Sequence, residues 1–261
     1  MSEKPVGVVR KSVDGRVCVI TIDNVAKKNA VTPEMMDQLA LCLTEFEDDD
    51  ELWVAVIEAE GEHTTAGLDM PKFFGPGATV KPRPQGWVDP LGLQRRCSKP
   101  VITAVQGITY TVGIELMLAG DIVIAADTAR FGQVEAKRGI APFGGAHFRY
   151  LTRTGWGNAM YHLFTAEEFS AQRALEIGLV QEVVPFGEQR ARAIELAQQI
   201  CTCAPLGVRA TKAAALTFTE HGEEAAIAVV PAMREKLLAS ADFVEGVQSF
   251  VERRAAVFTG H

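Results

Sequence analysis

The chain carries two glutamates whose surroundings suit proton transfer. Glu115 lies in the apolar stretch TYTVGIELMLAGDIVIAAD, residues 109–127, which predicts a helix followed by a buried strand. Removing an ionised carboxylate from water is costly unless a partner or a shifted pKa compensates for the lost hydration. Glu135 lies in ARFGQVEAKRG, residues 129–139. Two such carboxylates near one another could exchange protons with a bound substrate.

Two glycine-rich segments lie where a strand is expected to lead into a helix. They are TTAGLDM, residues 64–70, and QGITYTVGIELMLAGDI, residues 106–122. The first N–H groups of a helix have no intrahelical acceptor and attract anions. If both junctions faced one cavity, their N–H groups would form an oxyanion hole. Beside a carboxylate pair, such a site suits proton transfers next to a thioester carbonyl.

Each glutamate also has a purely structural interpretation. Glu115 would be a buried carboxylate held by an arginine or by backbone N–H groups. Glu135 would be an ordinary residue at the end of a strand. The residue types alone leave both interpretations open.

Strand and helix signals alternate over the first two thirds of the chain, which indicates an α/β fold. Asp14-Gly15 lies between two strand-like runs and predicts a hairpin, and Thr32-Pro33 predicts the start of an amphipathic helix. Farther along, Thr165 with Glu168 matches a capping box. Other expected features are a cap at Ser170, a helix end at Gly178, strands at 53–61, 100–107 and 122–127, a short helix at 91–99, and helices from about 187 to the end.

Composition narrows the class of protein. The 261 residues carry 26 basic and 33 acidic side chains, a net charge of −7, without any basic run, so nucleic acid is not expected as a partner. The longest apolar region, 101–126, is interrupted by polar residues and glycines and does not predict a membrane span. The five irregularly spaced cysteines favour reduced thiols in a cytoplasmic protein, and no metal site is expected.

Six segments in order resemble the crotonase superfamily, the enoyl-CoA hydratase/isomerase proteins. They are NAVTPEMMDQL, AGLDM, KPVITAVQG followed by GIELMLAGDIVIAAD, ARFGQVEAKRGIAPFGGA, ALEIGLVQEVVP and FVERRAAVFTG, and they cover nearly the whole chain. The resemblance implies a spiral of ββα turns at residues 1–194 and a C-terminal helical oligomerisation region at 195–261. It also implies a homotrimer or a dimer of trimers.

The resemblance assigns roles to four residues. The backbone N–H groups of Leu68 and Val112 would form the oxyanion hole, and Glu115 and Glu135 would be the two catalytic glutamates. Family members that only isomerise a double bond usually keep one glutamate, so both together favour an enoyl-CoA hydratase. Double-bond isomerisation, thioester hydrolysis and non-catalytic binding of a CoA ester remain alternatives.

No cofactor is implied, since coenzyme A arrives as part of the acyl-CoA substrate. Lys and Arg side chains suit its phosphates, although Lys27 and Lys28 also fit solvated turn residues. By resemblance, the coenzyme A site includes Lys27, Lys28, Ala66, Gly67 and Asp69, with Phe250 and Arg253 approaching from a neighbouring subunit.

The chain departs from the family pattern where the acyl group is expected. Val112 replaces one glycine of a common run of three, and Phe143 replaces a glycine after the proline of IAPFGG, so both add bulk. Trp87 and the Phe73-Phe74 pair, in the Gly/Pro-rich segment 71–90, either line an acyl pocket or only order that loop. The departures leave the expected chemistry intact and the acyl group undetermined.

Overall fold

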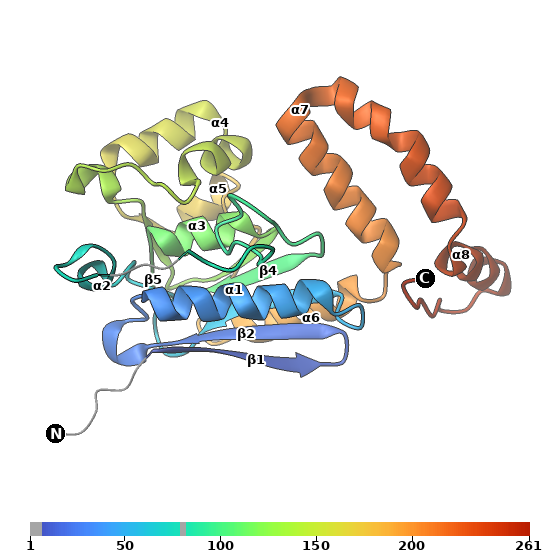
Figure 1. Ribbon diagram of the computed structural model, residues 1–261, viewed down its shortest axis with the longest axis horizontal. Coiled ribbons are helices and arrows are strands. Elements are labelled where there is room, and N and C mark those ends of the chain that lie inside the picture. The colour runs from blue at the N-terminus through green and yellow to red at the C-terminus, as the bar shows by residue number, and fades with distance from the viewer. Residues whose placement is uncertain (1–6, 79–81) are drawn as a thin grey trace.

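A six-stranded sheet forms the centre of the computed structural model, which describes residues 7–78 and 82–261 (Figure 1). Its strand order is β1-β2-β3-β4-β6-β9, and only the pairing of β1 with β2 is antiparallel. The strands are β1 (Val8–Asp14), β2 (Val17–Asp23), β3 (Val54–Ala59), β4 (Val101–Val105), β6 (Ile122–Ala126) and β9 (Glu182–Val184). The parallel strands are almost wholly apolar because both faces of the sheet are covered.

A smaller sheet of three strands follows the same winding. It consists of β5 (Ile108–Tyr110), β7 (Arg130–Gly132) and β8 (Phe169–Ser170). β4 is followed directly by β5, and β6 by β7, so successive turns of the chain add one strand to each sheet. This arrangement confirms the expected spiral of strand–strand–helix turns.

Helices cover the sheets and carry the residues of interest. The longer helices of the core are α1 (Pro33–Asp48), α3 (Val112–Ala119), α4 (Ala146–Thr165) and α6 (Gln189–Ile200); shorter ones are α2 (Met70–Phe74), α5 (Ala171–Glu176), η1 (Val25–Lys27) and η2 (Glu135–Arg138). α1 begins as predicted, because the Thr32 side chain accepts the Met35 N–H and Pro33 is the first helical residue. The hairpin at Asp14-Gly15 is also confirmed, with Gly15 at φ 57°.

Two local predictions are wrong. Thr165 ends α4 instead of capping a helix, because its hydroxyl donates to the Tyr161 carbonyl while Glu168 pairs with Tyr110 and Arg130. Residues 91–99 form no helix, because the Asp89 carboxylate accepts N–H groups of that segment and holds it in turns. The cap at Ser170 and the helix end at Gly178 are confirmed.

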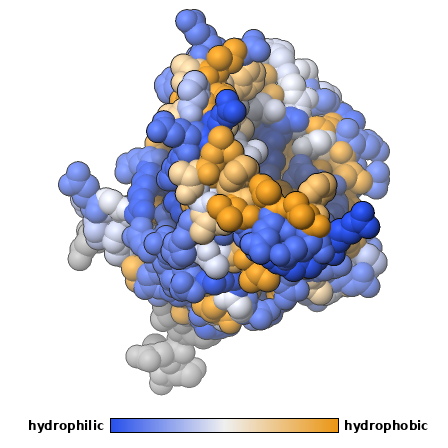
Figure 2. Space-filling view, turned by 90° about the vertical axis from the view of Figure 1, so that its right-hand side faces the viewer, coloured by the Kyte–Doolittle hydropathy of each residue, from blue (hydrophilic) through white to orange (hydrophobic). Residues whose placement is uncertain are grey.

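The C-terminal helices project from one end of the core (Figure 1). α7 (Pro205–Leu238) is bent at Gly222, which has φ 82°, and α8 (Ala241–Glu252) follows it. The two helices border an apolar groove of about 480 Å³ that includes Phe243, Val247 and Phe250. Figure 2, viewed from this side, shows apolar residues exposed on the surface. The boundary predicted at residue 195 falls within α6, and the division into two regions stays a prediction.

Candidate active site

Glu115 lies in the first turn of α3 with only 5% of its surface exposed. One carboxylate oxygen accepts the Ala146 N–H at 3.4 Å. Burial raises the pKa of Glu115, while the backbone N–H groups of Ala146 and Gly144 and the charge of Arg149 oppose that rise. Donors of this kind stabilise the ionised form, so they limit the rise in the pKa of Glu115.

Gly144 packs directly against the Glu115 carboxylate. A Cβ at Gly144 would lie 2.4 Å from Oε2 and 2.9 Å from Oε1 of Glu115. Since real Cβ contacts are essentially never that short, only glycine leaves room for the carboxylate in this position. Gly144 therefore contributes space as well as an N–H group.

Glu135 lies on η2, not at a strand end, and its environment differs from that of Glu115. The Gln133 amide donates to Oε1 at 2.8 Å, whereas Oε2 is buried and has no partner among the described residues. Burial, helped by the negative charge of Glu115, raises the pKa of Glu135 to about 7. The negative charge of Glu115 therefore favours the protonated form of Glu135.

Arg149, which the sequence analysis did not identify, supports this site from α4. Its guanidinium donates to the carbonyls of Leu91 at 2.6 Å, Gly92 at 2.9 Å and Gly144 at 3.1 Å. The side chain thereby ties the segment after Asp89 to the loop that contacts Glu115. The only signal in the sequence is its position among apolar residues on a helical face, three residues after Ala146.

The two glycine-rich junctions, at Leu68 and Val112, lie close together in the fold. Single parallel bridges pair Val31 with Leu68 and Thr65 with Thr109, which brings the two junctions together. The bridge to Val31 uses the Gly67 carbonyl and the Asp69 N–H, so the Leu68 N–H points to the other side. Within the described chain, neither the Leu68 nor the Val112 N–H donates to a protein acceptor.

Close packing explains the backbone conformations at this pair of junctions. Gly67 has φ 115°, and a Cβ there would lie 2.8 Å from Thr111 Oγ1. Thr111, the residue before α3, has φ 49° and ψ −110°, which is unusual for a side chain with a branched Cβ. Strained backbone of this kind persists where the surrounding structure fixes it, as functional sites often require.

Five of the residues predicted to hold coenzyme A lie together. Lys27 pairs with the buried Asp69 at 2.8 Å, and the Ala66 N–H donates to the Lys28 carbonyl at 2.9 Å. Gly67 lies between Ala66 and Leu68, which with Val112 forms the predicted oxyanion pair. Phe250 and Arg253 lie on α8 and at its end, across the molecule from α2 in Figure 1. Their role as residues of a neighbouring subunit stays a prediction.

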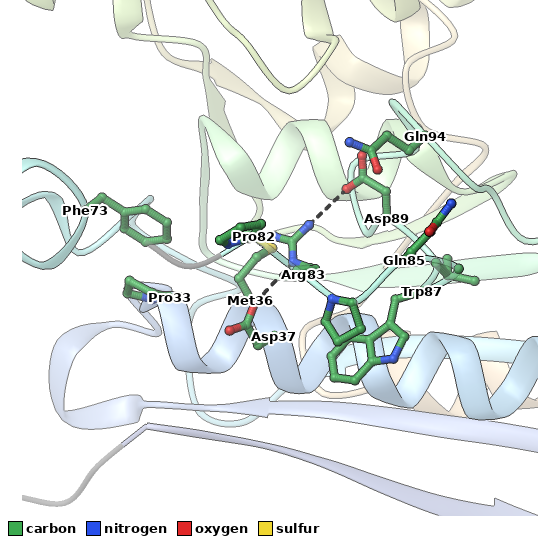
Figure 3. A pocket seen from close by; sticks show the side chains of 13 residues that line it. Pro33, Met36, Asp37, Phe73, Pro82, Arg83, Gln85, Trp87, Asp89 and Gln94 are labelled. Carbon is green, nitrogen blue, oxygen red and sulfur yellow. Dashed lines mark hydrogen bonds and ion pairs between the residues drawn. The ribbon is translucent and has the colours of Figure 1, made fainter. Parts of the chain in front are cut away.

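A cavity of about 370 Å³ lies between the start of α1 and residues 82–94 (Figure 3). Phe73 and Trp87 both line it, whereas Phe74 is exposed and does not; a role in binding the acyl group stays a prediction. Phe143 is 71% exposed, whereas Val112 is buried in the core cluster beside the cavity. Only Val112 therefore adds bulk inside the protein.

The described part of the chain offers no group of three His, Cys, Asp or Glu side chains arranged to bind a metal ion. Over the same residues, no helix combines the length and apolar character that a bilayer crossing requires.

Comparison with known proteins identifies the family. A model described as enoyl-CoA hydratase/isomerase matches residues 12–261. The chain belongs to this family. Enoyl-CoA hydratase EchA19 of Mycobacterium tuberculosis is 30% identical over 94% of this chain and 93% of its own length. The short-chain-enoyl-CoA hydratase of Clostridium acetobutylicum is 31% identical over 92% and 93%.

Solved structures agree with this assignment and with the crotonase fold. A probable enoyl-CoA hydratase/isomerase from Mycobacterium abscessus superposes with a TM-score of 0.92 at 44% identity, covering 97% of this chain and 99% of that protein. The enoyl-CoA hydratase of Mycobacterium tuberculosis gives a TM-score of 0.89 at 31% identity, with the same coverage. This enoyl-CoA hydratase/isomerase family member therefore shares its fold with enzymes named as hydratases.

Proposed function

We propose that the chain catalyses reversible addition of water across the 2,3 double bond of an enoyl-CoA thioester. Two observations support this proposal: burial raises the pKa of both the buried Glu115 and the half-buried Glu135, and the N–H groups of Leu68 and Val112 have no protein acceptor in the described chain. The N–H groups of Leu68 and Val112 would stabilise the negative charge that develops on the thioester oxygen when water adds. Each such donor typically contributes about 10²–10³ in rate.

The two glutamates would divide the work according to their surroundings. Glu115, supported by backbone N–H groups and by Arg149, would be the ionised base that removes a proton from water as its oxygen adds to C3. Glu135, with a pKa of about 7, would be protonated in much of the population and would give its proton to C2. Glu115 takes one proton from water and Glu135 gives one proton to C2, so the enzyme carries the same number of protons before and after the addition.

Coenzyme A would be bound as part of the substrate, with no separate cofactor. Lys28 and the main chain around Ala66 offer hydrogen-bonding groups on the exposed side of the oxyanion pair. Lys27 is already paired with Asp69, so a phosphate would have to share it.

Assembly as a homotrimer or a dimer of trimers, with Phe250 and Arg253 reaching a neighbour's site, is part of the proposal. Its test is the molecular mass of the protein in solution. A cytoplasmic location stays a prediction.

The test follows the loss of enoyl absorbance when the protein meets crotonyl-CoA in water, with identification of the 3-hydroxyacyl product. Glu115→Gln and Glu135→Gln should each lower kcat by about 10²–10⁴. Glu58→Gln is the matched control, since Glu58 is equally buried at 5% exposure but pairs with Thr21 and Arg190. Retention of full hydratase activity in both site variants would refute the proposed roles. A shifted double bond without a hydroxyl product would indicate isomerisation instead.

A further inference from the structure

The cavity of about 370 Å³ is bordered by Pro33, two residues after Val31, and a strand bridge pairs Val31 with Leu68. Its lining residues Met36 and Val88 belong to the same apolar cluster as Val112 of α3. Phe73, another lining residue, is on α2, which begins two residues after Leu68. A thioester whose oxygen is held by Leu68 and Val112 would therefore extend its acyl group toward this cavity. Its volume is within the range of about 300–1,000 Å³ that is usual for small-molecule sites.

An ionic group at the centre of the cavity distinguishes it from a pocket for a plain alkyl chain. Arg83 Nε lies 3.2 Å from Asp37 Oδ1, and Arg83 Nη1 lies 3.4 Å from Asp89 Oδ1. Figure 3 shows Arg83 between the two aspartates, with Phe73 and Trp87 on opposite sides. One positive and two negative charges leave a net charge of −1, which disfavours a carboxylate at the end of the acyl group.

Part of the polar lining has hydrogen-bonding capacity that the protein does not use. Asp89 is satisfied, since its oxygens also accept the N–H groups of Leu91 and Leu93. Asp37 accepts only from Arg83 among the described residues. The amides of Gln85 and Gln94, in the same part of the chain, have no hydrogen-bond partner there. An alkyl chain would desolvate these groups without replacing their bonds to water, whereas a hydroxyl could donate to Asp37 and accept from Arg83 or a glutamine.

Apolar rings make up much of the remaining lining. They are those of Phe73 and Trp87 and of three prolines: Pro33, Pro82 and Pro84. The aromatic faces of Phe73 and Trp87 favour contact with another aromatic ring.

We propose that the acyl group of the preferred substrate is an aromatic ring that bears a hydroxyl group, conjugated to the enoyl thioester. This inference rests on the proposed function and specifies its substrate class. The ring packs against the apolar side chains of the lining, and the hydroxyl group bonds to Asp37 and Arg83. The lining therefore selects for a neutral polar substituent and against both an alkyl chain and an anion.

The test compares kcat/KM for hydration of 4-hydroxycinnamoyl-CoA, cinnamoyl-CoA and crotonyl-CoA, followed by the 3-hydroxyacyl product. Because Arg83 and Asp37 are partly exposed, the hydroxyl should raise kcat/KM about tenfold over cinnamoyl-CoA, far less than the 10⁴–10⁵ of a fully buried hydrogen-bonding site. Asp37→Ala should reduce this ratio to near one. Glu34→Ala, on an adjacent turn of α1 and paired with Thr32 and Lys72 instead of Arg83, should leave the ratio unchanged.

The outcomes separate this inference from the proposed function. Hydration of crotonyl-CoA with no preference for the hydroxylated ring would overturn the inference alone. If no thioester is hydrated, the proposed function fails, and calorimetric binding of the same compounds decides the inference. Tighter binding of 4-hydroxycinnamoyl-CoA than of cinnamoyl-CoA, lost in Asp37→Ala, would support it, and equal binding would overturn it. A preference for an enoyl-CoA with a terminal carboxylate would also overturn it.

Discussion

Replacement of Gly144 by alanine would test whether the Glu115 carboxylate must lie where the structure places it. The added Cβ would be 2.4 Å from Glu115 Oε2, and ordinary contact begins near 3.4 Å, so the carboxylate must move by about 1 Å. Gly144 does not have a positive φ, so this substitution adds a steric conflict without a backbone penalty. A displacement of that size can cost about 10²-fold in rate, and overpacking costs about 1–3 kcal/mol of stability.

The matched control is Gly157→Ala, because a Cβ at Gly157 meets open space and the residue does not have a positive φ. It should leave kcat unchanged and keep or slightly raise the free energy of unfolding. kcat is measured by loss of enoyl absorbance with crotonyl-CoA, and stability by urea unfolding. The double variant Gly144→Ala with Glu115→Asp shortens the side chain, so stability should return with a coupling energy of about 0.5–3 kcal/mol. Gly144→Ala with wild-type kcat and stability would refute the packing argument.

Three further variants test the electrostatics and the oxyanion pair. The pKa of Glu135 is raised to about 7, so the native state binds this proton more tightly than the unfolded chain does. The free energy of unfolding should therefore fall as pH rises from about 4.5 to 7. Glu135→Gln should flatten this part of the stability curve, which urea unfolding at several pH values measures. In the wild type, kcat/KM should fall as pH rises through about 7. Arg149→Met leaves three carbonyls without their donor and should cost about 2–4 kcal/mol in urea unfolding. Arg149→Met should also raise the pKa of Glu115 and shift the acidic limb of the pH profile of kcat to higher pH. An unchanged limb would contradict the electrostatic effect of Arg149 on Glu115. Gly67→Ala should lower kcat/KM by about 10²–10³. The control is Gly77→Ala: Gly77 also has a positive φ, but its added Cβ would meet open space, so this variant measures only the cost of placing alanine at a positive φ.

The sequence predicted features that depend on neighbouring residues along the chain. The hairpin at Asp14-Gly15 and the cap at Thr32 were correct because each depends on residues within one turn. Glu115 could be singled out because its neighbours in the helix are apolar. The capping box at Thr165 failed because Glu168 pairs with Tyr110, which is 58 residues away. Local motifs predict a cap only where no tertiary partner competes for the side chain.

The contacts that define the site escaped sequence reasoning because they join distant segments. Arg149 bonds to carbonyls 57 and 58 residues earlier, and no pattern in the chain indicates which carbonyls those are. The contact between Gly144 and Glu115 is similar, since a glycine in a sequence does not disclose which atom occupies the space beside it. The roles of Phe250 and Arg253 depend on a neighbouring subunit and stay predictions.

The two glutamates show how the donors around a shielded carboxyl group distinguish residues of one type. Burial raises the pKa of both, so burial alone would make them equivalent. The difference comes from the donors: the loop held by Arg149 directs backbone N–H groups at Glu115, while one oxygen of Glu135 has no donor in the described chain. Because the charge of Glu115 also disfavours a second charge nearby, ionisation of one carboxyl keeps the proton on the other. Removing the N–H groups from Glu115 should therefore lower the pKa of Glu135 as well as raise that of Glu115, a reciprocal change that two independent carboxyl groups would not show.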